Sequence, residues 1–438
     1  MGEKIAKAIE KVYHLSANKK RKASSMALKV TKSRTIVLPL TESIYSDFMQ
    51  DNNYAHALIQ ASYAQHPGLF PSEMSGGYKL NGRTSVSKKL GYALRRIRIA
   101  GVSYQLRPSF VLPYMRAKTS EVEDALFLLR FGVPFWALAQ VFGRYPMFWY
   151  RCFICLSNFS IVGTTVYAPE CLPEDLLADE FHTRTKGQKT YIATTISQGC
   201  FLGLEATSAA DAPALTDAYG IFKAEALNLK PDYQPHSVNT DGWQATQKAW
   251  KTLFSLIAVV ECFLHAFIKI RDRATKKLQA SFNLAADKVW EIYRAESKSH
   301  MAQRIRRLAQ WAKENLKDSP MKENILKLCK KRKRWLAHFD FPAAYRTSSQ
   351  LDRLMRAMER HAINSQMFHA NLKSTTKNFR AFALLYNFSP SSPTVCKKCP
   401  QLQSPAARLN EKVLHQNWLQ NLLLAASLKG YRQQQNPV

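Results

Sequence analysis

Two aspartates stand where their carboxylates can do chemistry on phosphodiesters. Asp179 follows the apolar run 176–178, and Asp241 follows the strand-like stretch 236–240, so each is expected at the end of a strand. Carboxylate oxygens are the ligands that Mg²⁺ or Mn²⁺ prefers, and two such ions about 4 Å apart support in-line displacement at phosphorus. If the two strands are neighbours, the side chains meet and predict a site for two metal ions. The alternative is that both aspartates are ordinary turn or cap residues.

Strands and helices are expected to alternate around these aspartates. β-Branched and apolar residues favour strands, whereas longer segments with helical periodicity favour helices. In chain order we expect strands at 176–181, 190–196 and 200–206, a helix at 212–228, a strand at 236–241, a helix at 244–254 and a strand at 256–262. This is the order of a ribonuclease-H-like mixed sheet, an α/β fold in which the first and fourth strands are neighbours. The expected catalytic core comprises residues 160–265 and 341–390.

Three short motifs follow one another in this segment: Asp179-Glu180 closing a strand, Thr240-Asp241-Gly242, and Cys262-Phe263-Leu264-His265. Together with the basic segment that follows, they resemble the Mutator-like DDE transposases of bacterial insertion sequences, over about residues 175–390. The resemblance implies a hydrolytic nick that exposes a 3′-hydroxyl, followed by strand transfer into a target. Cys262 and His265 are expected to pack and hydrogen-bond behind the acids. They are too few for a structural zinc site, which usually takes four ligands.

The third acid departs from the pattern of that family. The family places a glutamate near the start of the helix after the basic insertion, whereas this chain has Thr347-Ser348-Ser349-Gln350-Leu351-Asp352. Asp352 is therefore expected as the third catalytic residue and metal ligand, because aspartate is shorter but still a hard oxygen ligand. The change leaves open an impaired or inactive enzyme. The alternatives for the third acid are Glu359, two helical turns further on, and Glu291 or Glu296 within the insertion.

The charge of the chain indicates a polyanionic partner. In 438 residues, 63 Lys and Arg stand against 32 Asp and Glu, a formal net charge of +31. Nucleic acid fits best, because phosphate contacts release counterions and supply affinity for any sequence. An anionic membrane surface is the rival, but no apolar run approaches the roughly 18 residues of a spanning helix, and no secretory signal is visible. We expect a cytoplasmic, nucleoid-associated protein with reduced cysteines and no membrane partner.

The N-terminal part is expected to bind DNA. Residues 1–35 are expected to form a basic, flexible tail, and residues 36–157 a folded region whose first elements the sequence does not assign. At about 119–157, capping-box, glycine and proline signals predict three short helices in the manner of a helix-turn-helix. Its cationic side chains, Arg144 and Arg151, are expected to contact DNA. The alternative is that the aromatics of the third helix make it part of a core.

The segment 266–340 is expected to be a basic helical insertion. It carries 20 Lys and Arg against 8 Asp and Glu, which favours contact with the DNA backbone over a merely solvated face. The densest block supplies the candidate DNA-binding residues Lys331, Arg332, Lys333 and Arg334. Trp335 beside it is the candidate for stacking on an unpaired base, with core packing as the alternative. Residues 391–438 are expected to be a loosely packed tail, with one more helix possible at 414–428.

The sequence thus predicts a transposase that cleaves double-stranded DNA at element ends and joins it to a target, using two Mg²⁺ or Mn²⁺ ions. By analogy with such enzymes it is expected to act as a homo-oligomer on DNA. Three alternatives remain open: a catalytically inactive DNA-binding protein derived from a transposase, a ribonuclease-H-like structure-selective nuclease, and an RNA-binding protein.

Overall fold

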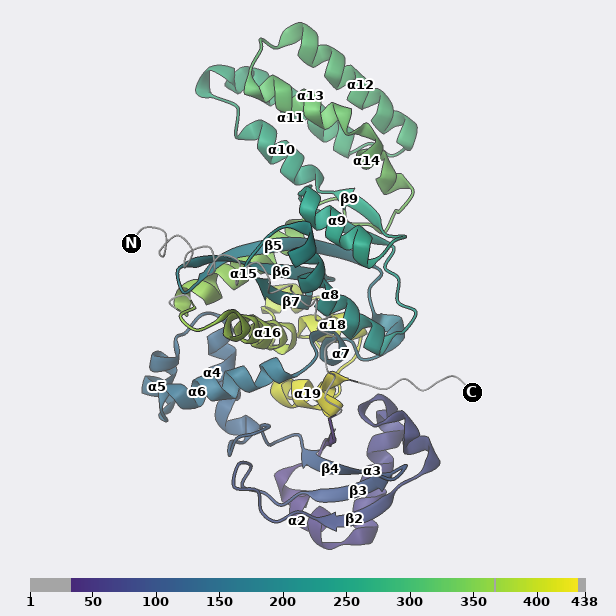
Figure 1. The fold of residues 1–438 in the computed structure, drawn as a ribbon, viewed down its shortest axis with the longest axis vertical. Coiled ribbons are helices and arrows are strands. Elements are labelled where there is room, and N and C mark those ends of the chain that lie inside the picture. The colour runs from purple at the N-terminus through teal and green to yellow at the C-terminus, as the bar shows by residue number, and fades with distance from the viewer. Residues whose placement is uncertain (1–32, 366–367, 432–438) are drawn as a thin grey trace, which may run out of the picture. The chain divides into compact units, whose positions relative to one another are not determined.

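Two β-sheets and the helices around them make up the part of the chain that the structure describes. The computed structural model describes residues 33–365 and 368–431. The predicted basic tail lies outside these residues as far as position 32, as do the last seven residues of the predicted C-terminal tail. Mixed strand pairing and many helices place the protein in the α/β class (Figure 1). Among the described helices, none is long and apolar enough to cross a membrane.

The larger sheet has five strands in the spatial order β7-β6-β5-β8-β9. β5, β6 and β7 are antiparallel neighbours, whereas β8 and β9 continue the sheet in parallel with β5. This confirms the predicted series of three strands, helix, strand, helix, strand. The bounds are β5 Asp175–Thr185, β6 Gln188–Ser197, β7 Cys200–Thr207, α8 Ala212–Leu229, β8 Ser237–Thr240, α9 Gln244–Leu253 and β9 Ala258–Glu261.

Alternating apolar residues give this sheet two buried faces, because successive side chains of a strand point to opposite sides. Leu177, Ile192 and Phe201 belong to one core, which they share with α16 (Leu372–Phe388). Leu176, Ala178, Ala193 and Leu202 belong to a second core, shared with α8. Adjacent residues of β5 therefore face different helices, and this rule continues into the acids at positions 179 and 180.

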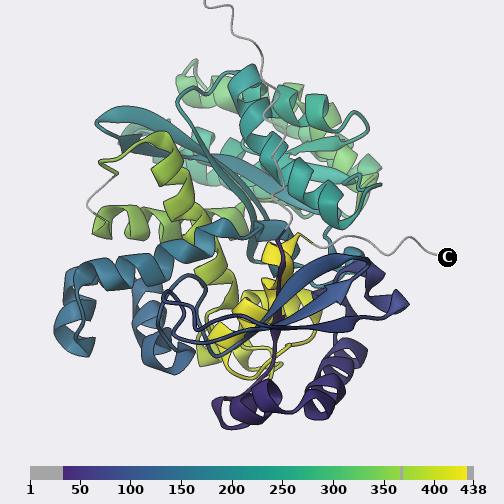
Figure 2. The same ribbon diagram turned by 60° about the horizontal axis from the view of Figure 1, so that its bottom comes forward.

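The smaller sheet lies in the N-terminal region that the sequence left unassigned. Its order is β1-β4-β3-β2, with β1 parallel to β4 and the other pairs antiparallel. Figure 2 shows α2 and α3, coloured purple, beside these strands. Buried Tyr45 and Phe48 of α2 and Ile59 of α3 share a core with the sheet. The bounds are β1 Thr35–Leu38, α2 Glu42–Gln50, α3 Asn52–Gln65, β2 Lys79–Arg83, β3 Arg95–Ile99 and β4 Val102–Pro108.

The three short helices predicted before the core are present as α4 (Thr119–Arg130), α5 (Phe135–Phe142) and α6 (Pro146–Ile154). Gly132 and Gly143, both with positive φ, separate them. On α6 the side chains of Trp149, Cys152 and Phe153 are buried in the core that includes α16. One face of the third helix therefore packs inside the protein.

The basic insertion is a helical unit with a core of its own. Five helices contribute buried residues to it, among them Val289, Ile305 and Leu328. Each helix is amphipathic and buries one apolar stripe, which leaves its charged residues outside. Another helix, α15 (Ser349–Asn364), follows the insertion. The insertion helices are α10 Phe263–Arg271, α11 Gln279–Tyr293, α12 Lys298–Asn315, α13 Pro320–Lys330 and α14 Arg332–Leu336.

The prediction of a loosely packed tail from residue 391 is wrong for residues 404–430. Buried residues form the helices α18 (Pro405–Asn410) and α19 (Trp418–Ala425). The Asn417 side chain caps α19 by accepting hydrogen bonds from its first N–H groups. Leucines of α19 are buried in the cores of both sheets, so this segment is an integral part of the fold.

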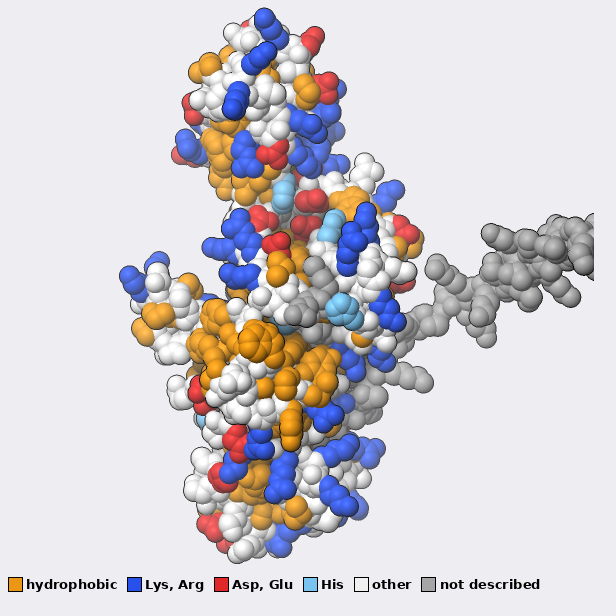
Figure 3. Space-filling model, turned by 90° about the vertical axis from the view of Figure 1, so that its left-hand side faces the viewer, with side chains coloured by type: hydrophobic (Ala, Val, Ile, Leu, Met, Phe, Trp, Pro, Cys, Tyr) orange, Lys and Arg blue, Asp and Glu red, His pale blue; other side chains and the backbone are white. Residues whose placement is uncertain are grey.

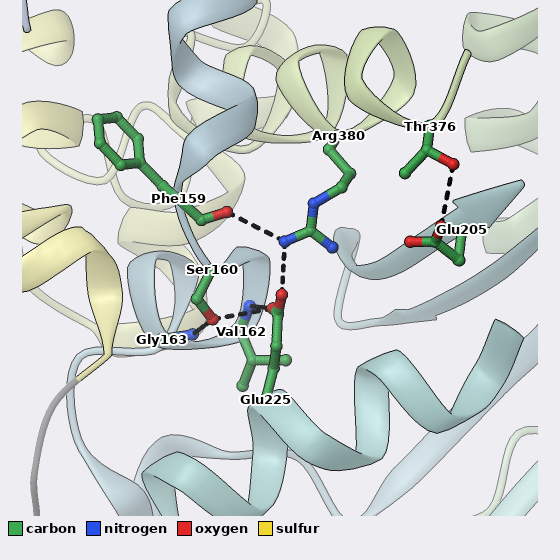
Figure 4. A network of polar contacts seen from close by, with 8 residues as sticks. All are labelled: Phe159, Ser160, Val162, Gly163, Glu205, Glu225, Thr376 and Arg380. Atoms are coloured by element: carbon green, nitrogen blue, oxygen red, sulfur yellow. Dashed lines mark hydrogen bonds and ion pairs between the residues drawn. The ribbon is translucent and has the colours of Figure 1, made fainter. Parts of the chain in front are cut away.

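A buried ion pair joins the helices on the two faces of the larger sheet (Figure 4). Arg380 of α16 donates to Glu225 of α8 at 2.5 Å and to the carbonyl of Phe159 at 3.1 Å. The second oxygen of Glu225 accepts from the Ser160 hydroxyl at 2.8 Å and the Val162 amide at 3.1 Å. The negative charge of Glu225 is thus neutralised by Arg380, and both of its oxygens accept hydrogen bonds.

Candidate functional site

Asp241 directly follows the end of β8, whereas Asp179 lies inside β5 and not at its end as predicted. β5 continues past Asp179 because β6 pairs with it, with Asp179 opposite Thr194. The paired register of β5 and β8 ends at Leu177 opposite Asn239, and each aspartate comes two residues later.

Asp241 accepts a hydrogen bond from the amide of Trp243 at 2.8 Å, which holds its carboxylate at the start of the turn. Burial, then the negative charges of Asp241 and Glu180, raise the pKa of Asp179 to about 7. The two aspartates thus feel each other's charge.

Glu180 lies beside Asp179 in sequence but faces the other side of the sheet. Its carboxylate accepts from the Tyr219 hydroxyl at 2.7 Å and from Thr246 at 2.8 Å, and its side chain is buried. Burial raises the pKa of Glu180 to about 7. Since its oxygens are engaged by α8 and α9, Glu180 acts as a structural residue behind Asp179.

Ser348 connects the predicted third acid to the predicted Cys-His pair. Its hydroxyl lies 3.3 Å from Nδ1 of His265, 3.3 Å from Oδ1 of Asp352 and 3.3 Å from Sγ of Cys262. The Ser348 amide also donates to Cys262 at 3.2 Å. The site residues predicted from sequence did not include Ser348. Its only signal is the Thr-Ser pair at 347–348, where the polar start of a helix follows the insertion.

His265 carries positive charge toward the acids. Its hydrogen bond with Cys262 is the main cause that raises the pKa of His265 to about 9, and the charges of Asp352 and Asp179 add to it. Burial acts to raise the pKa of Cys262, but hydrogen bonds with His265 and Ser348 outweigh it and leave that pKa below its ordinary value. Asp352 and Asp179 thus both affect the pKa of His265, and Asp241 affects that of Asp179.

The metal-binding chemistry of this neighbourhood is that of hard oxygen donors. Within residues 33–365 and 368–431, no group of three or more His, Cys, Asp or Glu side chains is already close enough to hold an ion. The donors on hand are a pair of aspartates and Asp352 on the adjacent helix, which suit Mg²⁺ or Mn²⁺ in type. The alternative third acids lie elsewhere: Glu291 and Glu296 are exposed on the insertion, and Glu359 is exposed on α15.

Two of the four cations in the basic block predicted to contact DNA form ion pairs with a buried carboxylate. Lys331 and Arg334 both pair with Glu261, whose side chain is only 3% exposed at the end of β9. The separation of Arg334 from Glu261 is 2.7 Å. For these two residues, contact with DNA would compete with a buried carboxylate. Arg332 and Lys333 are exposed and stay candidates for phosphate contact.

The prediction that Trp335 stacks on an unpaired base is wrong, because its ring is not accessible. The side chain is 4% exposed, and its indole N–H donates to the carbonyl of Leu328 at 2.9 Å. Its ring packs edge-on against Phe263, with centroids 5.3 Å apart. The alternative of core packing is confirmed, since Trp335 belongs to the core of the insertion.

Arg144 and Arg151 are both exposed at the turn between α5 and α6 and on α6. The Arg144 guanidinium lies 5.5 Å from the centroid of Phe148. Around them the surface is apolar, with Trp136 65% and Tyr145 80% exposed. The two cations are thus available for contact with a polyanion, but within an aromatic rather than a basic surface.

Acidic and histidine side chains gather on one face of the molecule, and Lys and Arg side chains lie around them (Figure 3). On this face, acidic side chains are therefore surrounded by cationic ones. No family model matches the chain, and no curated protein matches it. What the site does must therefore be argued from its own geometry.

Proposed function

We propose that the chain is a DDE-type transposase that cleaves and joins DNA strands with two metal ions, on a ribonuclease-H-like core. The strand order supports this fold, since three antiparallel strands are followed by two parallel ones beside the first. Asp241 directly follows β8, and Asp179 lies within the neighbouring strand β5, two residues past its pairing with β8. The basic helical insertion stands between the second acid and the third, as in the Mutator-like transposases that the motifs resemble.

The observation that carries the proposal is the pairing of Asp179 with Asp241. Neither aspartate forms an ion pair with a Lys or Arg side chain among the described residues, although the chain has an excess of cations. The positive charge of His265 acts on Asp179, but burial and the like charges of Asp241 and Glu180 outweigh it, so the pKa of Asp179 is raised and its charged form is unfavourable. A divalent cation would reverse that balance, so the arrangement fits a metal site.

Asp179, Asp241 and Asp352 are the residues that would hold the ions. Mg²⁺ or Mn²⁺ bound there supplies activation of the attacking oxygen and stabilisation of the leaving oxygen at phosphorus. Ser348 acts as a positioning residue, since its hydroxyl donates to Asp352 and it stands at the start of α15. His265 lies on the other side of that hydroxyl and acts through it. The Asp352 carboxylate is thus held by a hydrogen bond from Ser348, even though its side chain is one methylene shorter than the glutamate of the family.

The DNA partner follows from the charge of the chain. With a net charge of +31, sequence-independent attraction to phosphates is strong at low salt. We propose that α4, α5 and α6 act as a helix-turn-helix at element ends, with Arg144 and Arg151 toward the DNA. Arg332 and Lys333 of the insertion contribute backbone contacts. A homo-oligomer on paired ends completes the proposal by analogy with related transposases.

The test is cleavage of DNA that carries the sequences flanking the gene, with Mg²⁺ or Mn²⁺. We expect Asp179→Asn, Asp241→Asn and Asp352→Asn each to lose cleavage by roughly a hundredfold or more while still binding DNA. Asp287→Asn is the matched control, because Asp287 is exposed on α11 away from the cluster, and it should cleave as the wild type.

Three outcomes would change the assignment. Undiminished cleavage by Asp241→Asn would refute the metal site, whereas undiminished cleavage by Asp352→Asn alone would move only the third ligand. Binding of DNA without metal-dependent cleavage by the wild type would favour a non-catalytic DNA-binding protein. Cleavage without strand joining would favour a structure-selective nuclease.

A further inference from the structure

Arg107 of β4 is a buried arginine with few hydrogen-bond partners. The other two arginines that are buried among the described residues are well supplied, since Arg380 has a glutamate partner and Arg95 donates to four oxygens. The Arg107 side chain is 4% exposed, but it donates only to the carbonyl of Val111 and forms no ion pair within the described part of the chain. Burial lowers the pKa of Arg107 to about 10, so the guanidinium is still charged at neutral pH. A buried charge without a counter-charge is unfavourable, and a bound anion would relieve this.

The Arg107 side chain is part of the wall of a pocket that is lined by cations. Arg107, Lys89 and Lys429 all line this pocket, whose volume is about 170 Å³. The described residues of its wall include no carboxylate, and neither lysine forms an ion pair with any described residue. Like charges gathered around a hollow attract an ion of the opposite charge. Polar side chains that can donate hydrogen bonds complete the wall: Ser33, Thr35, Ser87, Gln105 and Tyr114.

Two segments that are distant in the sequence form the pocket. Arg107 points away from α2 and α3, because its neighbour Leu106 is buried in the core shared with those helices and side chains alternate along a strand. The segment Ser427–Gly430 packs against β1, where the amide of Val37, the residue paired with Arg107, donates to the Ser427 hydroxyl at 3.1 Å. Figure 2 shows this C-terminal segment, coloured yellow, beside the strands. The pocket therefore lies where the C-terminal segment meets the face of the smaller sheet that α2 and α3 leave free.

The size of the pocket and the cations beyond it favour one kind of anion. Its volume is below the roughly 300 Å³ at which small-molecule sites begin, so it admits a group such as one phosphate rather than a whole nucleotide. On the same sheet face as Arg107, Ser103 of β4 is paired with Arg98 of β3, which is paired in turn with Lys79 of β2. Arg98 and Lys79 are both exposed. A polymer of phosphates can thus place one group in the pocket and others along the sheet, whereas a free phosphate uses the pocket alone.

We propose that this pocket binds one backbone phosphate of DNA, with Arg107 as the anchor and Lys89 and Lys429 beside it. A guanidinium can donate two parallel hydrogen bonds to one phosphate, whereas a lysine acts as a point charge. The neighbouring phosphates of the strand lie toward Arg98 and Lys79. The inference rests on the proposed function for the choice of DNA, and it adds a phosphate site outside the helix-turn-helix and the basic insertion.

The first test asks whether the pocket binds phosphate, with inorganic phosphate as the probe. The melting temperature of the full chain is measured without divalent metal, in potassium phosphate and in potassium chloride of equal ionic strength. Phosphate stabilises folded proteins in general, so the variants are compared with the wild type. The wild type should gain more than Lys89→Gln/Lys429→Gln, because an anion that binds the folded state stabilises it by mass action. Lys88→Gln is the matched control, since Lys88 is exposed like Lys89 but does not line the pocket.

Arg107→Met extends this test to the anchor. Methionine keeps an apolar chain of similar reach without the charge, so the gain in phosphate should be lost. A structural role alone would lower the melting temperature equally in phosphate and in chloride. If Arg107→Met does not fold, the lysine variants decide, because Lys89 is exposed and Lys429 is half-buried.

The second test asks whether the phosphate belongs to DNA. Fluorescence anisotropy measures the affinity for duplex DNA across a salt series, again without divalent metal. Each phosphate contact contributes about 0.9 to the slope of log affinity against log salt, so Lys89→Gln/Lys429→Gln should reduce the slope by about 1. Lys88→Gln should leave the slope unchanged.

The outcomes separate the site from the proposed function. An equal gain in phosphate for the wild type and the Lys89→Gln/Lys429→Gln variant would overturn the pocket as an anion site. A gain that the variant loses, with an unchanged salt slope for DNA, would mean that the pocket takes free phosphate and would overturn the DNA contact. A wild type that shows both effects but cuts no DNA would support the site and contradict the catalytic proposal.

Discussion

The buried carboxylate of Glu225 and the half-buried carboxylates of Asp179 and Asp241 lie beside the same sheet, but their charges are balanced in opposite ways. Glu225 has a buried arginine as its partner and two further hydrogen-bond donors (Figure 4). Asp179 has the like charges of Asp241 and Glu180 as neighbours, which the positive charge of His265 does not offset, and it accepts a hydrogen bond from the amide of Glu180 at 2.8 Å. The first arrangement is complete without a ligand, whereas the second becomes favourable when a cation is added.

This difference separates residues that hold the fold from residues that await a partner. A neutralised pair such as Glu225 and Arg380 loses stability when one member is removed, because the other charge is left buried. An unneutralised pair such as Asp179 and Asp241 loses repulsion when one member is removed. Substitutions in the two places should therefore change the free energy of unfolding in opposite directions.

The largest effect is expected from Arg380→Met. Glu225 would keep its burial and lose its cation, so the free energy of unfolding should fall by about 3–5 kcal/mol. Urea denaturation followed by circular dichroism measures this. The double variant Glu225→Gln/Arg380→Met removes both charges and should recover most of the loss. A loss below about 1 kcal/mol in Arg380→Met would mean that the pair contributes little and that the contrast with the aspartates is false.

A smaller loss of folding free energy is expected from Gly242→Ala. Gly242 follows Asp241 in sequence and lies against the ion-paired Glu261. Gly242 has φ of +95°, and a Cβ there would lie 2.7 Å from Oε1 of Glu261. Backbone strain and this clash should cost about 1–3 kcal/mol and lower cleavage by displacing Asp241. Gly187→Ala is the control, since Gly187 has φ of +76° with open space around it. If both variants lose equal stability, the contact with Glu261 has no effect.

A gain is expected from Asp179→Asn in metal-free protein at pH 8. The pKa of Asp179 is about 7 in the folded protein and near 3.8 in the unfolded chain. The folded state therefore binds more protons between about pH 4 and 7, and the aspartate becomes destabilising as the pH rises through that window. Asparagine should raise the free energy of unfolding by on the order of 1–2 kcal/mol at pH 8, and by nothing at pH 3.5.

Thermal melts with and without Mg²⁺ complete that test. Added Mg²⁺ should raise the melting temperature of the wild type and not that of Asp179→Asn, because an ion that binds the folded state stabilises it by mass action. Asp287→Asn serves again as the exposed control. The prediction is contradicted if Asp179→Asn raises stability equally at every pH, or if Mg²⁺ leaves the melting temperature of the wild type unchanged. Either result would mean that charge repulsion at Asp179 is absent.

The sequence predicted those elements whose own residues carry a clear apolar pattern and whose neighbours in the sheet lie close in the chain. The apolar residues before Asp179 and before Asp241 predicted a strand at each place. The alternation of strands and helices then predicted that these two strands are neighbours, as β5 and β8 are. By contrast, β2 is a polar stretch, Lys79–Arg83, without apolar alternation, and β1 pairs with a strand some seventy residues away. Neither leaves a periodic signal in its own segment.

The site shows the same limit. Asp179, Asp241, Cys262, His265 and Asp352 were each predicted from motif and spacing, and they share one neighbourhood. A basic block, however, looks the same in sequence whether its charges face solvent or a buried acid. The pairing of Lys331 and Arg334 with Glu261 depends on how the insertion packs, as does the burial of Trp335, and periodicity cannot supply either.

The smallest effect is expected within the basic block, where Lys331 and Arg334 are paired with Glu261 and Arg332 and Lys333 are not. Arg332 and Lys333 are exposed, so replacing both with glutamine should reduce the slope of log affinity for DNA against log salt by about 1–2. Lys331→Gln with Arg334→Gln should change that slope less and should lower the free energy of unfolding instead, because Glu261 is left buried without a cation. Fluorescence anisotropy across a salt series measures the slope, and urea denaturation of the same samples measures stability. If Lys331 and Arg334 release as many counterions as their exposed neighbours, DNA phosphates displace Glu261 from them, and the paired cations serve the ligand as well as the fold.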